Sequence, residues 1–328
     1  MKNLFAPHIE ALSAILSKVR YQKDKGNYFY KNGARNVLFR LEALCRIGKS
    51  IHDKKFFSRW GKEFKKLEDI LGEIDHQDAM ASEFGAMPLL ANQVRSGIEK
   101  DLVLRTTELS RILVDDGWMS GEKLDKFTAG LKKQDEVDPK KFRMRVAEFL
   151  LDTMAAIEED YDDGKIDLTH LEAGLHEFRR EIRWISIYAL VLDGLIQLRP
   201  VAVVDSAMKL YTPKNIVESP FNVMPKPHEA YPPLYIQSTS WYALSWLIQH
   251  LGDLKDIGLR YHTFMDLSGG AKYKQRTDRA SLTKKFLATC DVPPAELSPR
   301  AEMAIDHFLY RDWIFNRIAR DLRRGLKT

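Results

Sequence analysis

The stretch Leu67-Glu-Asp-Ile-Leu-Gly72-Glu-Ile-Asp-His-Gln-Asp78 decides the fold that we expect, because a similar stretch occurs 180 residues later. The second copy reads Leu247-Ile-Gln-His-Leu-Gly252-Asp-Leu-Lys-Asp256. Both contain L-x-x-x-L-G-[DE]-[IL], with apolar residues at the three- and four-residue spacing of a helix. We therefore interpret the chain as a helical protein with an internal duplication.

A basic amphipathic segment precedes each copy. The first begins at Lys31 and the second at His176, an offset of about 144 residues. The two offsets differ by about 36 residues, which is the approximate length of the proline-rich passage 199–235. One insertion in the second half explains both offsets. Chance similarity between helical heptads is the alternative.

Each repeated glycine lies inside a helical pattern, where glycine costs roughly 1 kcal/mol relative to alanine. A glycine is favoured there when another element must approach the helix closely. We therefore expect Gly72 and Gly252 to lie where each long helix crosses the basic helix of its own half. The crossing segments would be 35–47 for Gly72 and 176–189 for Gly252.

Composition limits the class of protein. The chain has 328 residues, 45% of them hydrophobic, which is enough for a substantial core. No run of about 18 uncharged apolar residues is present, and the first 20 residues do not resemble a secretory signal, so we expect no membrane association. The two cysteines, Cys45 and Cys290, lack metal-site spacing and are interpreted as reduced thiols of a cytoplasmic protein.

Charge is distributed in three blocks. Residues 1–66 carry sixteen basic and five acidic side chains, a balance of +11. Residues 67–178 carry thirteen and twenty-six, which gives −13, and residues 179–328 carry twenty-two and fifteen, which gives +7. Folding could join the two basic blocks into one field that attracts a polyanion. Solvated helix faces without any ligand are the alternative.

Helical periodicity dominates, and only 201–204 and 235–237 are candidates for short strands. The passage 199–235 holds seven of the thirteen prolines, so it cannot be a continuous helix and is interpreted as an ordered connection or lid. A Gly-Gly loop is expected at 266–276. Its backbone N–H groups and basic residues could bind phosphate, although a mobile surface loop is favoured.

These repeats resemble the CHAD family (conserved histidine α-helical domain), whose halves each have a basic helix H-x-x-R-x-x-x-[RK]-R-L-R and a helix ending L-G-x-x-x-D. In the second half, His176, Arg179 and Arg183 match the pattern of the basic helix. Gly252 and Asp256 match the pattern L-G-x-x-x-D.

The first half departs from the family pattern. Asn32 stands where the family has histidine, and Phe39 and Glu42 replace two basic positions. Arg35 matches, but Asp75 replaces an arginine near Asp78. These departures put ligand binding by the first half in doubt.

The resemblance implies an all-α fold of two antiparallel four-helix bundles related by a pseudo-twofold. The halves would be residues 1–165 and 166–328. In the first half, the expected elements are a basic helix near 31–50 and an L-G helix near 60–80. In the second half, they are a basic helix near 175–197, the insertion 199–235, an L-G helix near 240–262 and a C-terminal helix near 303–326.

The resemblance also implies non-catalytic binding of inorganic polyphosphate, or a related phosphate polyanion, in a basic channel between the halves. Four basic residues of the second helix, from His176 to Arg183, fall within about 100° on a helical wheel, and guanidinium groups suit phosphate oxygens. Pairing of these arginines with Glu177, Glu181 or the acidic block is the alternative. The candidate binding residues are Lys31, Arg35, Arg40, Arg46, Lys49, His176, Arg179, Arg180 and Arg183.

Other function classes remain open. A helical scaffold or partner-binding protein would keep the duplicated fold without the ligand, and an enzyme acting on phosphorylated substrates is a third class. No nucleophile and base pairing is visible, so we expect no catalytic residues and no cofactor. Glu73-x-x-His76 has di-iron ligand spacing but lacks a second copy, so no metal site is expected. No sequence-specific nucleic-acid motif is present, whereas a protein partner remains open.

Overall fold

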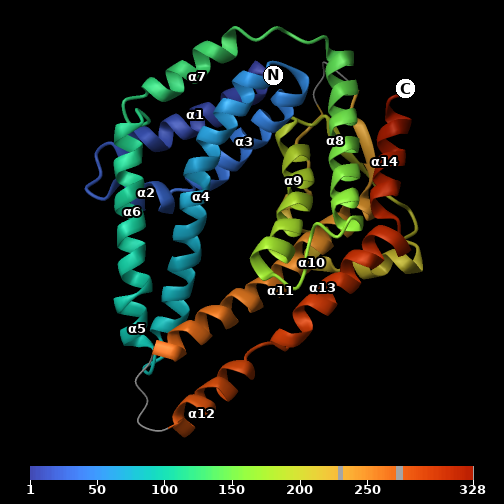
Figure 1. Ribbon diagram of the computed structural model, residues 1–328. Coiled ribbons are helices and arrows are strands. Elements are labelled where there is room, and N and C mark those ends of the chain that lie inside the picture. Colours follow the sequence, from blue (N-terminus) through green and yellow to red (C-terminus); the bar gives the residue numbers. More distant parts are fainter. Residues whose placement is uncertain (228–231, 271–275, 328) are drawn as a thin grey trace. The chain divides into compact units, whose positions relative to one another are not determined.

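The computed structural model describes residues 1–227, 232–270 and 276–327, and helices dominate them (Figure 1). The expected helical class is therefore confirmed. The chain forms two compact units. Unit 1 consists of Met1–Glu136 and His262–Thr283, and unit 2 of Val137–Tyr261 and Lys284–Thr328. The boundary expected between 165 and 166 concerns the sequence repeat, whereas the first division between compact units falls after Glu136.

Unit 1 is built around a long helical hairpin, α3 and α4, which lie side by side in Figure 1. Gly33 separates α2 from α3 because its φ of 76° lies in the left-handed region that favours glycine. Asp53 begins α4 by accepting hydrogen bonds from the backbone N–H groups of Lys55 and Phe56. The helices of unit 1 are α1 Lys2–Val19, α2 Lys25–Lys31, α3 Ala34–Ile51, α4 Lys54–Gly85, α5 Ala91–Ser96, α6 Ile98–Asp115 and α7 Glu122–Lys132.

Unit 2 also has a helical core. Its longer elements are α8 Pro139–Asp162, a π-helical turn Leu171–His176, α9 Glu177–Val191, α13 Leu297–Asp306, a second π-helical turn His307–Arg311 and α14 Ile314–Gly325. Two further helices, α11 Ser238–Gly270 and α12 Arg276–Leu287, each contribute residues to both units. Four apolar residues of the first π-helical turn and α9, Leu175, Phe178, Ile182 and Ile185, are all buried.

Two short strands pair in parallel within unit 2. β1 is Ile196–Arg199 and β2 is Leu234–Gln237, with Ile196 opposite Leu234. The strand expected at 235–237 is thus confirmed, and the one expected at 201–204 is wrong. Pro200 directly follows β1 and has no N–H to donate to a ladder, and Val203 is 81% exposed.

The proline-rich passage forms short turns, as expected for a segment that cannot be one helix. The described part contains 3-10 turns at Ser206–Tyr211 and Pro220–Asn222 and the short helix α10 Lys214–Val217. The buried Asn222 side chain donates to the Ile216 carbonyl at 2.7 Å and accepts from Ser245 Oγ at 2.5 Å. These bonds hold the passage against α11.

Several expected elements differ in their bounds: the two L-G helices are longer than expected, as α4 and α11, and the first basic helix begins at Ala34. The loop expected at 266–276 is helical up to Gly270, and 271–275 lie outside the described residues. The second basic helix ends at Val191 rather than near 197, because the chain turns there into β1. The C-terminal helix is interrupted between α13 and α14, where Trp313 has a φ of 53°.

Within the described residues, no helix is both long and apolar enough to span a membrane. Cys45 and Cys290 are both free of disulfide bonds, and burial raises the pKa of the Cys45 thiol.

Candidate functional site

The two repeated glycines each receive an arginine from the basic helix of the same unit. In unit 1, a Cβ added to Gly72 would lie 2.8 Å from Nη2 of Arg35, which is on α3. In unit 2, a Cβ added to Gly252 would lie 2.9 Å from Nε and 3.0 Å from Nη2 of Arg179, which is on α9. The expectation that each glycine permits a close crossing with its own basic helix is confirmed.

The unit 1 crossing is neutralised by carboxylates of α4. Arg35 Nε donates to Glu68 Oε1 at 2.9 Å, and Nη1 donates to Asp75 Oδ2 at 2.7 Å. Lys31 pairs with Asp78 at 2.9 Å, and the Tyr30 hydroxyl donates to Asp75 and Asp78. The acidic α4 residues therefore bind the cations that the sequence assigned to a ligand.

The unit 2 crossing holds its arginine differently. Arg179 Nε donates to the backbone carbonyl of Ile248 at 3.0 Å, and Arg179 forms no salt bridge with any described residue. Asp253 and Asp256 still interact with it electrostatically. Burial lowers the pKa of Arg179, since taking a charge out of water without a paired anion disfavours the charged form.

Aligning the crossings on their glycines explains the contrast. Ile248 occupies the place of Glu68, and Lys255 the place of Asp75. Both carboxylates that pair with Arg35 are thus replaced in unit 2, one by an apolar residue and the other by a cation. Arg179, the arginine of the unit 2 crossing, can therefore donate hydrogen bonds to an external anion.

His176 joins Arg179 in a cluster. Burial lowers the pKa of His176, and Lys255, Arg179 and Arg180 lie close enough to lower it further, against the opposing effect of Glu172. Nδ1 of His176 is buried without a hydrogen-bond partner. The structure therefore brings Arg179, Arg180 and Lys255 close to His176. Lys255 also pairs with Asp256 at 2.5 Å.

The remaining predicted cations divide into paired and exposed ones. Arg46 pairs with the buried Glu42 at 3.0 Å, and Arg180 pairs with Glu177 at 2.6 Å. Arg40 and Lys49 are exposed on α3 and form no ion pair with a described residue. Arg183 follows Arg179 by one turn of α9. The pairing that the sequence left as an alternative thus applies to several of the nine residues.

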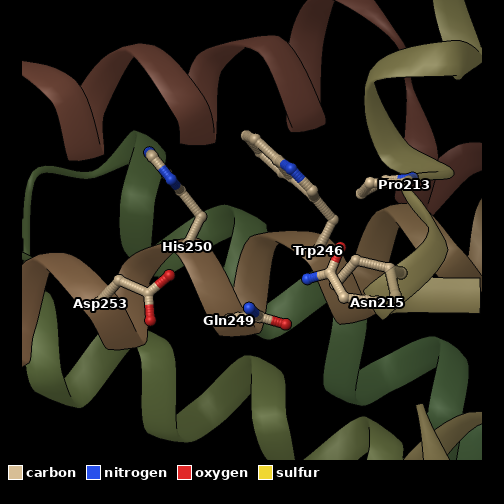
Figure 2. A pocket seen from close by; sticks show the side chains of 7 residues that line it. Pro213, Asn215, Trp246, Gln249, His250 and Asp253 are labelled. Atoms are coloured by element: carbon tan, nitrogen blue, oxygen red, sulfur yellow. The ribbon is translucent and has the colours of Figure 1, made fainter. Parts of the chain in front are cut away.

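A small pocket opens beside the unit 2 crossing. Figure 2 shows Trp246 and His250 rising from the same side of α11, and their rings stack at 4.8 Å with 10° between the planes. Burial lowers the pKa of His250 and raises that of Asp253. The pocket borders the crossing because Asp253 directly follows Gly252. Its lining residues are Pro213, Asn215, Ile216, Trp246, Gln249, His250 and Asp253.

Sequence reasoning missed a set of cations on α14. Arg320, Arg323, Arg324 and Lys327 are exposed, and none of them forms an ion pair with a described residue. The spacing of the three arginines places them on one face of the helix, and Lys327 lies in the turn that follows its last residue, Gly325. The spacing of these cations is present in the sequence, but α14 precedes neither copy of the repeat.

Groups of acidic, histidine and cysteine side chains that could hold a metal ion are absent from the described residues. Glu73, half of the di-iron spacing, instead pairs with Arg105 at 3.0 Å. No protein-family model, curated protein or solved structure matches the chain.

Proposed function

We propose that this protein binds inorganic polyphosphate, or a related phosphate polyanion, without catalysis, and that unit 2 provides the binding arginine. The observation that carries the proposal is that Arg179 has no carboxylate partner, whereas the matching Arg35 has two. A partly buried guanidinium without an ion pair gains free energy when an anion reaches it. Phosphate oxygens suit its fork of donors.

The surroundings of Arg179 favour an extended polyanion over a single small anion. Arg180 and Arg183 follow on the same helix, and Lys255 lies nearby on α11. Glu177 and Asp256 neutralise part of this charge. A polymer can exchange such surface ion pairs for its own phosphates, because each exposed pair contributes only about 0 to 1 kcal/mol.

The same comparison supports the CHAD resemblance. Arg35 contacts Gly72, and Arg179, at the equivalent position of the second repeat, contacts Gly252. The repeated sequence pattern around the glycines does not by itself require this contact. We infer from this that the units arose by duplication, and we propose paired four-helix bundles with a ligand channel between the halves as their arrangement. The first half would then have lost its anion site when Glu68 and Asp75 appeared.

Binding of long-chain polyphosphate at rising salt tests the proposed function. Affinity should fall several-fold between about 50 and 200 mM salt, because released counterions weaken the binding as salt rises. Duplex DNA should compete poorly, since the chain lacks a groove-reading motif. Equal affinity at both salt concentrations would contradict the proposal, and so would competition by DNA as strong as that by polyphosphate.

A helical scaffold that binds a protein partner is the second candidate. The ion pairs of Arg35 favour it, because they show one of the two basic helices used for internal packing. Under this function, neither arginine would matter for polyphosphate. Partner binding would then survive substitution of Arg179.

A further inference from the structure

The exposed side of α14 is a cationic surface without an assigned role. It consists of Arg320, Arg323 and Arg324 on the helix and Lys327 in the turn just after it, hereafter the α14 cationic face. At 100° per residue the three arginines span about 100° of the helix. The helix is anchored on its other side, where Ile314, Phe315, Ile318 and Leu322 are buried.

The charge of this face is not compensated by its own helix. Asp321 is the acidic residue of α14, and it is buried while accepting the Gln237 N–H at 2.9 Å. The helix dipole favours Arg323 and Arg324 in the last turn. It does not account for Arg320, which lies further from the end and is repelled by Arg324 one turn later.

A second group of cations adjoins the end of α14. Arg143 Nη2 on α8 donates to the Gly325 carbonyl at 2.5 Å, so the first turns of α8 lie beside the last turn of α14. Lys140 and Lys141 are exposed in that first turn of α8 and form no ion pair with a described residue. The cationic surface therefore extends beyond one helix.

An exposed tryptophan stands at the other end of α14. Trp313 precedes the helix, and its side chain is 54% exposed. Its backbone has a φ of 53° and a ψ of 43°, a left-handed conformation that is strained for a bulky residue and easy for glycine. An aromatic ring kept on the surface at a position that suits glycine points to a role for the ring.

We propose that α14 binds single-stranded nucleic acid, with a base stacked on Trp313 and the backbone phosphates on the α14 cationic face. Stacking on an aromatic ring next to a basic track is how proteins hold single strands without reading sequence. Trp313, at the N-cap of α14, and Arg324 are eleven residues apart, about 16 Å along the helix, which suits a few nucleotides. Inorganic polyphosphate has no bases, so Trp313 separates this site from the proposed function.

The test measures binding of a fluorescent oligothymidylate and of polyphosphate to the same variants of the full chain. Arg320→Gln/Arg324→Gln should weaken oligonucleotide binding about tenfold or more. It should also reduce the slope of log affinity against log salt by about 1.4, because each neutralised charge contributes about 0.7 for single strands. Lys132→Gln/Lys133→Gln, on exposed lysines of unit 1 without ion pairs, is the matched control and should change neither value.

Trp313→Gly removes the ring and keeps a residue that adopts the left-handed backbone without strain, so the fold should persist. It should lower oligonucleotide affinity at least fivefold and leave polyphosphate affinity unchanged. If the glycine variant unfolds, Trp313→Asn serves, because asparagine also tolerates this conformation.

Wild-type oligonucleotide affinity in the double glutamine variant would overturn the proposal. Equal losses for oligonucleotide and polyphosphate in Trp313→Gly would overturn it as well. Duplex binding as tight as single-strand binding would assign the face to general adhesion. None of these results depends on Arg179, so they leave the proposed function to its own test.

Discussion

The crossings at Gly72 and Gly252 place an arginine against a helix in the same way and then use it differently. In unit 1 the guanidinium joins two carboxylates, and in unit 2 it donates to one backbone carbonyl. A glycine that admits an arginine is therefore an architectural feature. Under the proposed function, the residues four before and three after that glycine determine whether the arginine can bind an anion.

Exchanging those neighbours should have the largest effect. Ile248→Glu/Lys255→Asp gives Arg179 the two carboxylates that Arg35 has, so polyphosphate binding should weaken by about 2 to 5 kcal/mol, at about 1.5 to 3 kcal/mol per charged hydrogen bond. Isothermal calorimetry measures this loss, with circular dichroism as the check on folding. The reciprocal Glu68→Ile/Asp75→Lys should tighten binding. No change in either variant would show that the neighbours do not control the site.

Leucine at either glycine should destabilise the protein by overpacking, typically by about 1 to 3 kcal/mol. Gly252→Leu should lie at the upper end, because Arg179 cannot move away without losing its bond to Ile248. Gly72→Leu should cost less, because the atom nearest an added Cβ is Nη2 of Arg35, whereas Nε and Nη1 make the bonds to Glu68 and Asp75. Denaturant unfolding measures both. A larger loss for Gly72→Leu would reverse the comparison.

The units should also differ in their response to acid. Burial and the nearby Arg40 lower the pKa of His8 in unit 1 from 6.5 to about 4. As the pH falls, His8 takes up a proton in the unfolded chain before it does so in the folded chain, which favours unfolding. The contribution of neutral His8 to the free energy of unfolding is therefore complete above pH 6.5 and is lost as the pH falls toward 4. Partial exposure limits the loss to about 1 to 2 kcal/mol. His8→Gln should remove this part of the pH dependence, measured by denaturant unfolding between pH 4 and 7.

His176 should contribute in the same direction in unit 2, because burial also lowers its pKa. A bound polyanion favours its protonated form, so polyphosphate affinity should rise as the solution is acidified. His176→Asn should flatten that rise, and His8→Gln should not. An unchanged pH profile in His176→Asn would remove the histidine from the site.

Alanine at the two glycines should give the smallest difference in stability between the units. The substitution favours the helix by about 1 kcal/mol through its higher helix propensity, but it places a Cβ against the guanidinium. At Gly72 the nearest atom is Nη2 of an arginine that can move, so Gly72→Ala should be neutral or stabilising. At Gly252 the nearest atom is the anchored Nε, so Gly252→Ala should destabilise by about 1 kcal/mol. Equal thermal midpoints for the two variants would contradict this distinction.

The sequence predicted the crossings because glycine inside a helix has a local cost that a repeat makes visible. It did not predict the ion pairs of Arg35, since Glu68 and Asp75 come from another helix whose rotation about its axis is set by packing. The position of β1 was missed for a similar reason. Parallel pairing of Ile196 with Leu234 is a long-range contact, and local pattern favoured 201–204 instead.

In other places the structure departs from the local signal in the sequence. Gly269 and Gly270 indicated a loop, yet α11 continues through them. Tryptophan is not a residue type that indicates a left-handed backbone, so the sequence did not predict the break at Trp313 before α14. The α14 cationic face was visible from spacing alone, but its freedom from ion pairs required the structure.

The most direct test of the central claim compares Arg179→Gln with Arg35→Gln in one polyphosphate titration at low salt. Each variant removes one guanidinium from an equivalent crossing, so each controls for the other. We predict that Arg179→Gln lowers affinity at least tenfold and that Arg35→Gln leaves it within about twofold of the wild type. Equal losses in the two variants, or a larger loss in Arg35→Gln, would contradict the account.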